Sequence, residues 1–298
     1  MTPDGQKGHN GTCAAAAGGK AGPNRIVGRS DLAPNVVEYR ILNPAVAQAC
    51  HPGQFVIVRG GDKSERIPLT IADFDRREGT VTLVIQAVGA STRELVAFRA
   101  GDAFRDLVGP LGHPSEIAKF GKVAMVGGGL GIAPVFPIQR AMKEAGNRVI
   151  GIMGARTKEL VFWEDRIRSV SDEFHLVTDD GSLGEKGFVT DALRRVIEGG
   201  TRPDRVIAIG PPVMMKAVAD VTRGPGIKTI VSLNSIMVDG TGMCGGCRIE
   251  VGGKTRFTCV DGPEFDAHEV DFDLLISRLS IYRNEEKAAV EHHGRKGK

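Results

Sequence analysis

Apolar positions follow two different patterns along the chain, and the change falls near residue 120. Between residues 25 and 118 they form short runs that end at Pro and Gly turns, and the run 80–88 partly alternates between apolar and polar side chains. Such alternation is typical of a strand with two unlike faces. The segment therefore predicts a small antiparallel β-barrel. The strands expected in it are 36–42, 54–59, 69–73 and 80–88.

From residue 119 to residue 233, short apolar strands alternate with helical stretches. The expected strands are 123–126, 149–153, 174–178, 206–209 and 228–233. The expected helices are 133–145, 160–170, 189–197 and 213–221. Alternation of this kind predicts a parallel sheet covered by helices on both faces. We therefore expect two domains, which a chain of 298 residues is long enough to form.

Both ends of the chain depart from these patterns. The segment 234–298 contains a cysteine loop, a hairpin around Gly252-Gly253 and a terminal helix expected over about 272–289. Residues 1–24 contain no Val, Ile, Leu or aromatic residue, so we expect a disordered tail. Its four-alanine run is too short for a signal-peptide core, and we expect a cytoplasmic protein.

Composition and charge argue against two classes of function. Hydrophobic residues make up 41% of the chain and charged residues 25%, as in ordinary globular proteins. The net charge is +3, with the basic residues spread out and few aromatic residues among them, which argues against nucleic-acid binding. No apolar run approaches the ~18 residues of a membrane span.

Three of the five cysteines lie close together in the C-terminal segment. Cys244 and Cys247 form a C-x-x-C pair, and Cys259 follows the predicted hairpin. An odd cysteine count with one local cluster favours a metal site over a disulfide framework. Glycines around the pair leave amides free to donate to sulfur, which stabilises an iron–sulfur cluster. Asp239 precedes the pair and is a plausible fourth ligand.

A structural zinc site is the main alternative for this loop. Zinc commonly uses two C-x-x-C-like knuckles, or Cys with His. Only one such knuckle is present, and the nearest later histidine is His268. We therefore favour an iron–sulfur cluster over zinc.

Residues 123–134 combine a strand, a glycine-rich turn and the start of a helix. A helix start reached through glycines presents free amides and positive partial charge to a phosphate. The strict dinucleotide fingerprint fails, because Ile132 stands at its third glycine position. Arg156, rather than an acidic residue, follows the second strand and is a candidate contact for adenosine ribose or phosphate. A simple Rossmann dehydrogenase is thus disfavoured. The glycines of the turn are Gly127, Gly128, Gly129 and Gly131.

Two more loops follow successive strands of the predicted sheet. Ligands of open parallel sheets bind at the carboxyl ends of the strands, so both loops are expected at the same pocket. Asp-Gly alone is mostly turn chemistry, and the stronger evidence is the order of these loops. The candidate residues are Asp179, Asp180, Gly181, Ser182 and Gly210.

Two motifs in the barrel are candidates for a second bound group. Arg66 is either a surface cation or a phosphate ligand, and Thr70 is either an ordinary strand residue or a neighbour of a flavin ring. Ser91 and Glu94 form a capping-box pattern, which opens a helix whose amides are suited to hold a pyrophosphate. The candidates are Arg66, Pro68, Leu69, Thr70, Gly89, Ser91 and Thr92.

Taken in this order, the motifs resemble the ferredoxin–NADP reductase-like flavoproteins over residues 25–280. The specific parts are the glycine-rich turn, the run 178–187 and the cysteine loop. Within this superfamily the chain is similar to electron-transfer subunits of dihydroorotate dehydrogenase. It is more similar to the small subunits of NADH-dependent reduced ferredoxin:NADP+ oxidoreductases, also known as sulfide dehydrogenase subunits, in which an aspartate at the position of Asp239 serves with three cysteines.

The resemblance implies an FAD domain over 25–118, a nucleotide domain over 119–233 and a [2Fe–2S] region over 234–298. It implies FAD contacts at the barrel candidates, NAD(H) contacts at the glycine-rich turn and the 179–182 loop, and cluster ligands at Asp239, Cys244, Cys247 and Cys259. Cofactors would carry the chemistry, so no catalytic acid or base is expected. The implied partner is a large FAD and [4Fe–4S] subunit that reduces ferredoxin and NADP+ by electron bifurcation.

Two other hypotheses remain open at this point. One is the electron-transfer subunit of dihydroorotate dehydrogenase. The other is a zinc-stabilised nucleotide-binding sensor without catalysis. The residues alone do not decide whether the nucleotide is NADH or NADPH, because Arg156 suits the 2′-phosphate of NADPH. The preference for NADH comes from the resemblance.

Overall fold

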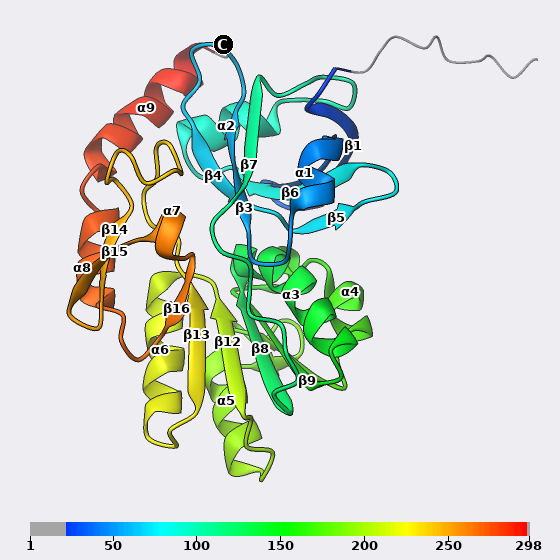
Figure 1. Cartoon of the computed structure of the whole chain (residues 1–298), viewed down its shortest axis with the longest axis vertical. Coiled ribbons are helices and arrows are strands. Elements are labelled where there is room, and N and C mark those ends of the chain that lie inside the picture. The colour runs from blue at the N-terminus through cyan, green and yellow to red at the C-terminus, as the bar shows by residue number, and fades with distance from the viewer. Residues whose placement is uncertain (1–21, 297–298) are drawn as a thin grey trace, which may run out of the picture.

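Two antiparallel sheets form the N-terminal domain of the computed structural model, which describes residues 22–296 (Figure 1). The strand order is β1-β2-β6-β5 in one sheet and β4-β3-β7 in the other. Alternate side chains of both sheets meet in one apolar core, and the hydroxyl of Tyr39 donates to the carbonyls of Leu95 and Phe98 at the end of α2. The elements are β1 (Arg25–Ala33), β2 (Val36–Leu42), α1 (Pro44–Ala49), β3 (Phe55–Arg59), β4 (Ile67–Thr70), β5 (Asp73–Asp75), β6 (Thr80–Gln86), α2 (Ala90–Val96) and β7 (Asp106–Leu111).

The antiparallel architecture is confirmed, but two local predictions are wrong. The strand expected at 69–73 is two strands, because the chain crosses from one sheet to the other at Ile71 and Ala72, whose amides donate to Gln54 and Thr82. Strand β6 ends at Gln86, two residues before the expected end. Residues 1–21 of the expected tail lie outside the described residues.

A seven-stranded sheet forms the second domain, in the order β11-β10-β9-β8-β12-β13-β16. All pairs are parallel except the last, where β16 from the C-terminal segment runs antiparallel to β13. The strands are β8 (Lys122–Gly128), β9 (Arg148–Ala155), β10 (Glu173–Thr178), β11 (Glu185–Lys186), β12 (Arg205–Ile209), β13 (Lys228–Ser232) and β16 (Glu264–Asp266). The helices are α3 (Ile132–Glu144), α4 (Glu164–Ser169), α5 (Val189–Glu198) and α6 (Pro212–Arg223).

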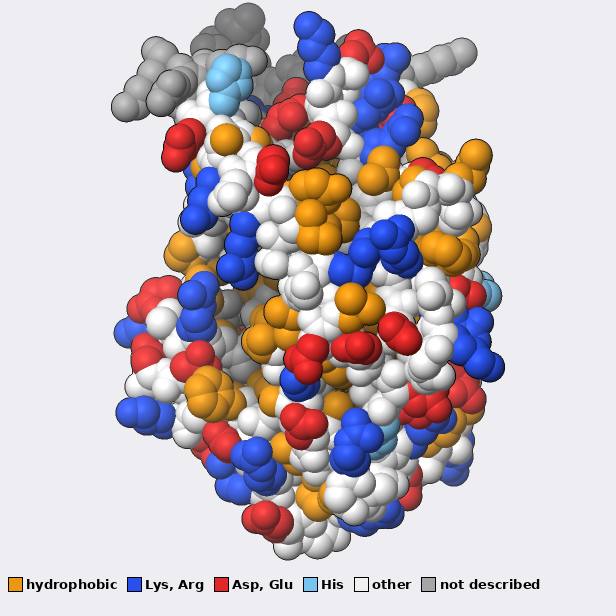
Figure 2. Space-filling view, turned by 90° about the vertical axis from the view of Figure 1, so that its left-hand side faces the viewer, with side chains coloured by type: hydrophobic (Ala, Val, Ile, Leu, Met, Phe, Trp, Pro, Cys, Tyr) orange, Lys and Arg blue, Asp and Glu red, His pale blue; other side chains and the backbone are white. Residues whose placement is uncertain are grey.

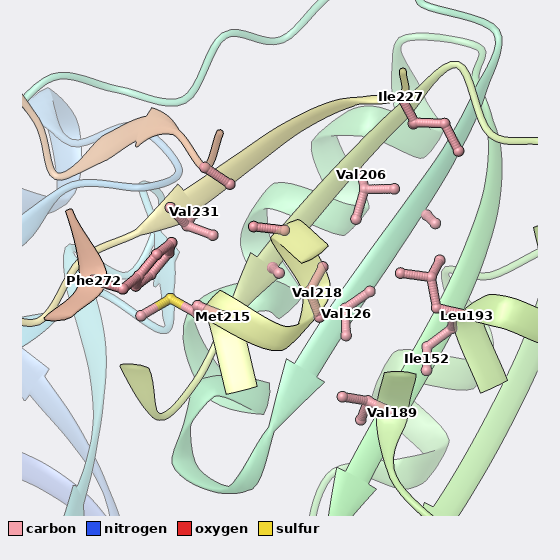
Figure 3. Close-up of a cluster of buried hydrophobic side chains, with 14 of the residues drawn as sticks. Val126, Ile152, Val189, Leu193, Val206, Met215, Val218, Ile227, Val231 and Phe272 are labelled. Atoms are coloured by element: carbon pink, nitrogen blue, oxygen red, sulfur yellow. The ribbon is translucent and has the colours of Figure 1, made fainter. Parts of the chain in front are cut away.

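Helices cover both faces of this sheet, as the strand–helix alternation predicts. Helices α5 and α6, with α8 (Phe272–Leu279), pack on one face over alternate strand residues such as Val126 and Val206 (Figure 3). Helices α3 and α4 pack on the other face over Met125 and Ile207. Successive residues of a strand point to opposite faces of the sheet, so one apolar strand contributes side chains to the hydrophobic cores on both faces.

The helix expected at 160–170 is shorter than predicted. A one-turn 3₁₀ helix covers Lys158–Leu160, and α4 begins only at Glu164. Trp163, which directly precedes α4, has a left-handed backbone with φ +59°. Its indole N–H donates to Glu38 of β2 at 2.9 Å, so the interruption of the helix coincides with a contact between the two domains. Helical periodicity along the chain gives no information about such a contact.

The C-terminal segment lies along both domains (Figure 1). Strands β14 (Arg248–Val251) and β15 (Lys254–Phe257) form the predicted hairpin, and α7 (Thr258–Asp261) follows it. The single helix expected at 272–289 is two helices, α8 and α9 (Arg283–Lys296), and α9 lies beside α2 of the barrel. The face that carries this segment has apolar patches between charged side chains of both signs (Figure 2). Within residues 22–296, every helix is too short or too polar to span a bilayer.

Candidate functional site

A cavity of about 950 Å³ lies where the barrel meets the carboxyl ends of the parallel strands. Strands β3, β4 and β6 line its barrel side, and the loops after β8, β9 and β12 line the other side. Concave, largely apolar walls with a few polar groups are typical of cofactor sites. The cavity therefore lies at the sheet edge where the order of the loops predicts a ligand.

The predicted binding residues divide into two groups. Those that line the cavity are Pro68, Leu69, Thr70, Gly128, Gly129, Gly131, Arg156, Asp179 and Gly210. Those outside its wall are Arg66, Gly89, Ser91, Thr92, Gly127, Asp180, Gly181 and Ser182.

Strand β4 supplies the predicted flavin-side residues. It is an edge strand, and Thr70 pairs with Phe55 while Pro68 pairs with Ile57 of β3. Edge strands leave backbone groups available for a ligand. Arg66 precedes the strand, is exposed, and makes no ion pair with another described residue. This side of the cavity suits a flat ring with an anionic tail.

The helix start after β6 differs from the prediction. Gly89, not Ser91, is the N-cap residue of α2, and the hydroxyl of Thr92 accepts from the amides of Val88 and Gly89 at 3.0 and 2.9 Å. Ser91 instead donates to Glu65 at 2.5 Å. The predicted Ser91–Glu94 capping box is therefore wrong: the helix begins earlier, and Thr92 occupies the position that closes the cap.

Packing explains most glycines of the turn at 127–131. A Cβ on Gly131 would lie 2.1 Å from the carbonyl oxygen of Ile209, and one on Gly128 would lie 2.2 Å from the sulfur of Met214. Gly129 differs, because it has φ +55° and no atom near its missing side chain. Its open side lies on the cavity wall, where a phosphate can approach the backbone closely.

The loop after β10 holds itself together beside Arg156. The hydroxyl and amide of Ser182 donate to Asp180 at 2.6 and 2.9 Å and lower the pKa of that carboxyl. The amide of Asp180 donates to the carbonyl of Arg156, so this loop abuts the end of β9. The Arg156 side chain is exposed on the cavity wall, without an ion pair to another described residue. It is free to bind an anionic ligand.

The structure brings two of the four predicted cluster ligands into contact. The sulfur atoms of Cys247 and Cys259 are both buried and lie 3.2 Å apart. Burial raises the pKa of the Cys259 thiol to about 12, and the neighbouring Cys247 thiol contributes to the same shift. Cys244 is exposed, and the carboxylate of Asp239 accepts from its amide at 2.9 Å. As placed, no three Cys, His, Asp or Glu side chains in residues 22–296 are close enough together to hold a metal ion.

The chemistry of the loop nonetheless fits an iron–sulfur cluster. Three thiols and a carboxylate lie within one loop and its hairpin, and amides already face sulfur: Gly246 N–H donates to Cys244 Sγ at 3.4 Å. Amides of Thr241 and Cys244 lower the pKa of Asp239, so its carboxylate is ionised. Positive φ angles at Gly240, Gly242 and Gly245 turn the loop tightly. Amide donors of this kind stabilise a negatively charged cluster.

The cavity and the cysteine loop share a wall. Phe55 and Met237 line the cavity and also pack in the same apolar cluster as Cys247 and Cys259. Gly240 lies against Ile57 of the barrel, where a Cβ would come within 2.8 Å of that side chain. A flavin in the cavity and a cluster in the loop would therefore be neighbours, with Phe55 and Met237 in the wall between them.

Several residues of the cavity wall are absent from the sequence predictions. Apolar side chains such as Phe55, Val84 and Met237 carry no motif, and only strand pairing brings them to the site. Phe188 and Val213 had one available signal, since each lies within six residues after a predicted ligand-binding residue, Ser182 or Gly210. The further wall residues include Gln86, Leu130, Gly154, Phe162, Pro211, Ser232, Leu233, Asn234, Ser235 and Pro263.

Comparisons with known proteins match the two halves of the site. The family model for the iron–sulfur cluster binding domain of dihydroorotate dehydrogenase B matches residues 234–271. The model for the oxidoreductase NAD-binding domain matches residues 125–220. Both matches fall where the structure has the cysteine loop and the glycine-rich turn.

Similar whole chains are also known. The dihydroorotate dehydrogenase B (NAD+) electron transfer subunit homolog of Thermotoga maritima is 48% identical over 268 residues, covering 90% of this chain and 94% of the relative. The corresponding electron transfer subunit of Fusobacterium nucleatum is 32% identical over 251 residues, covering 81% and 95%. A solved structure of an NADH-dependent reduced ferredoxin-NADP oxidoreductase, used to study flavin-based electron bifurcation, is 46% identical with a TM-score of 0.87, covering 92% and 99%.

Proposed function

The chain belongs to the family of dihydroorotate dehydrogenase B electron-transfer subunits and their homologues, and from this premise we propose that it is the diaphorase subunit of an NADH-dependent ferredoxin:NADP+ oxidoreductase. It carries electrons between NAD(H), FAD and a [2Fe–2S] cluster. One observation carries the proposal: Phe55 and Met237 line the cavity and also pack in the apolar cluster that contains Cys247 and Cys259.

The residues of the chain bind, orient and shield the cofactors. We place the flavin ring against Pro68–Thr70, the NAD(H) phosphates at the turn around Gly129, and the cluster at Asp239 and the three cysteines. FAD, when bound, accepts two electrons as hydride and releases them singly, which connects a nicotinamide to a one-electron cluster. The apolar wall keeps water from the layer between the two centres.

A larger partner subunit completes the reaction. The relatives are named electron-transfer subunits, which implies a partner that receives the electrons. We infer that this partner is the large FAD and [4Fe–4S] subunit that the sequence resemblance implies, because the similar solved structure is of an NADH-dependent reduced ferredoxin-NADP oxidoreductase studied for flavin-based electron bifurcation. With such a partner, NADH and reduced ferredoxin together would reduce NADP+, and in the bifurcating direction NADPH would reduce ferredoxin and NAD+. NADH is the expected nucleotide for the same reason.

Anaerobic purification of the chain with its natural partner tests this function. We expect a yellow-brown protein that releases FAD, contains iron and acid-labile sulfide, and co-purifies with a large iron–sulfur flavoprotein. The isolated chain should oxidise NADH with an artificial acceptor but should not reduce NADP+. A colourless zinc protein would contradict the proposal and support the sensor hypothesis.

A second candidate follows from the match at residues 234–271, whose family description is dihydroorotate dehydrogenase B. Reconstitution distinguishes the two functions. NAD+ reduction by dihydroorotate, after addition of a catalytic dihydroorotate dehydrogenase subunit, would favour this alternative. Its failure, together with NADP+ reduction by the co-purified complex that requires both NADH and reduced ferredoxin, would favour the first.

A further inference from the structure

Arg278 connects helix α8 to the cysteine loop. Its guanidinium Nη2 donates to the carbonyl of Gly246 at 3.1 Å, and the side chain is partly buried. Gly246 is also the residue whose amide donates to Cys244 Sγ, and it directly precedes Cys247. Arg278 is therefore attached to the short peptide segment that joins the two cysteines of the C-x-x-C pair.

The charge of Arg278 is not balanced by an acidic side chain. No Asp or Glu in the described part of the chain forms an ion pair with it, and none forms one with Arg248, which lines the same small pocket as Arg278 and Gly246. Two other cations are paired. Lys216 contacts Asp273 on α8 at 2.6 Å, and Arg256 on β15 lies 3.8 Å from Asp261. A partly buried cation without an acidic partner is costly unless some anion compensates it. The anion that fits this position is a cluster bound in the adjacent loop.

Helix α8 is anchored both to the hairpin that follows the C-x-x-C pair and to the core of the parallel sheet. Asp271 caps the helix by accepting from the amide of Leu274 at 2.9 Å, and its own amide donates to Glu250 of β14. Phe272 and Leu275 are buried in the core between α6 and the sheet. The guanidinium thus extends from a rigid element toward a loop of tight turns, and its charge stays beside that loop.

We propose that Arg278 is a positioning residue that raises the reduction potential of the [2Fe–2S] cluster by holding a fixed positive charge against the cysteine loop. The inference rests on the proposed function. The cluster gains one negative charge when it accepts one electron, so a nearby cation stabilises the reduced form more than the oxidised form. Arg278 would thereby favour electron flow into the cluster.

Redox titration of the purified complex, followed by electron paramagnetic resonance of the reduced cluster, tests the proposal. R278Q removes the charge and R278K keeps it. We expect R278Q to lower the reduction potential of the cluster by about 59 mV, which corresponds to a tenfold shift of the one-electron equilibrium toward the oxidised form. R278K should keep a potential near that of the wild type. K216Q is the matched control, because it removes a cation from the other contact of α8; its potential should equal that of the wild type.

The outcomes separate this inference from the proposed function. An unchanged potential in R278Q, with full iron and sulfide content, would overturn the role of Arg278 and leave the function intact. A potential in R278K as low as that of R278Q would also overturn it, since the charge would not be the cause. Should R278Q not assemble a cluster, the reduction potential of R278K is the remaining test: a value near that of the wild type supports the role of the charge, and a clearly lower value overturns it. A wild-type protein without iron would overturn both.

Discussion

At the residue scale, Glu264 shows how position decides the state of one carboxyl group. It lies on β16, and the Ser115 hydroxyl donates to it at 2.5 Å across the junction of the barrel, the linker and the C-terminal segment. Burial raises the pKa of Glu264, against the opposing effects of Ser115 and of Arg205. Arg205 is itself paired with Glu116 at 2.7 Å, so it does not fully compensate an ionised Glu264.

We expect E264Q to stabilise the protein more at pH 7.5 than at pH 4. Below the pKa of an unfolded glutamate, ~4.3, both states of the wild type are protonated. Above it the unfolded chain loses the proton while the folded protein keeps it, so the wild-type free energy of unfolding falls as pH rises to the folded pKa. Urea unfolding of both proteins at the two pH values measures the difference. A difference independent of pH would contradict a raised pKa.

At the scale of elements, the unit β8–turn–α3 shows how packing and ligand binding place different demands on neighbouring glycines. Gly131 lies against the backbone of β12, and Gly128 lies against a side chain of α6. Gly129 faces open space at the cavity. The glycine-rich pattern indicates a phosphate turn, but it does not distinguish the glycine that a ligand needs from those that the fold needs.

We expect G131A to destabilise the protein by about 1–3 kcal/mol, because its Cβ would meet the carbonyl of Ile209 and force the backbone apart. G129A is the matched control. It meets no atom and should cost only the ~1–2 kcal/mol of a left-handed backbone, while it weakens NADH binding. Denaturant midpoints and NADH titration measure the two effects. Equal stability of G131A and wild type would disprove the close packing.

At the scale of the whole molecule, two acidic side chains of the barrel, Glu38 and Asp73, bind residues of the second domain. Glu38 of β2 accepts from the indole of Trp163 at 2.9 Å and lies 3.4 Å from Arg166. Asp73 of β5 pairs with Arg140 of α3 at 2.7 Å. Because the cavity has one wall in each domain, these contacts also set the distance between the flavin side and the nucleotide side.

We expect E38A to loosen this junction and to cost about 1–3 kcal/mol, because the buried indole N–H loses its acceptor. Trp163 is the single tryptophan of the chain, so its emission should shift to the red as water reaches it. E78A is the control, since Glu78 pairs with Arg40 in an exposed surface bridge at 3.7 Å on the same sheet. Identical emission spectra for E38A and wild type would show that the contact does not close the junction.

Much of the fold and part of the site follow from the sequence. Period-two and strand–helix patterns predict both sheets, because side-chain alternation is a local property of a strand. The glycine-rich turn and the loops after β10 and β12 are expected at one sheet edge, and the cavity includes Gly129, Arg156 and Asp179. The C-x-x-C spacing predicts the cysteine loop, because it depends only on neighbours along the chain.

Tertiary structure decided what depends on residues distant in sequence. Strand pairing brings Phe55 to the cavity and β16 to the edge of the parallel sheet, and the packing of α8 brings Arg278 to the carbonyl of Gly246. The break before α4 accompanies the contact of Trp163 with Glu38, and α8 ends at Leu279 after packing on the core, whereas periodicity extends one helix to residue 289. Local patterns in the sequence reflect the geometry of a single helix or strand, whereas these features depend on contacts between elements that are far apart in the sequence.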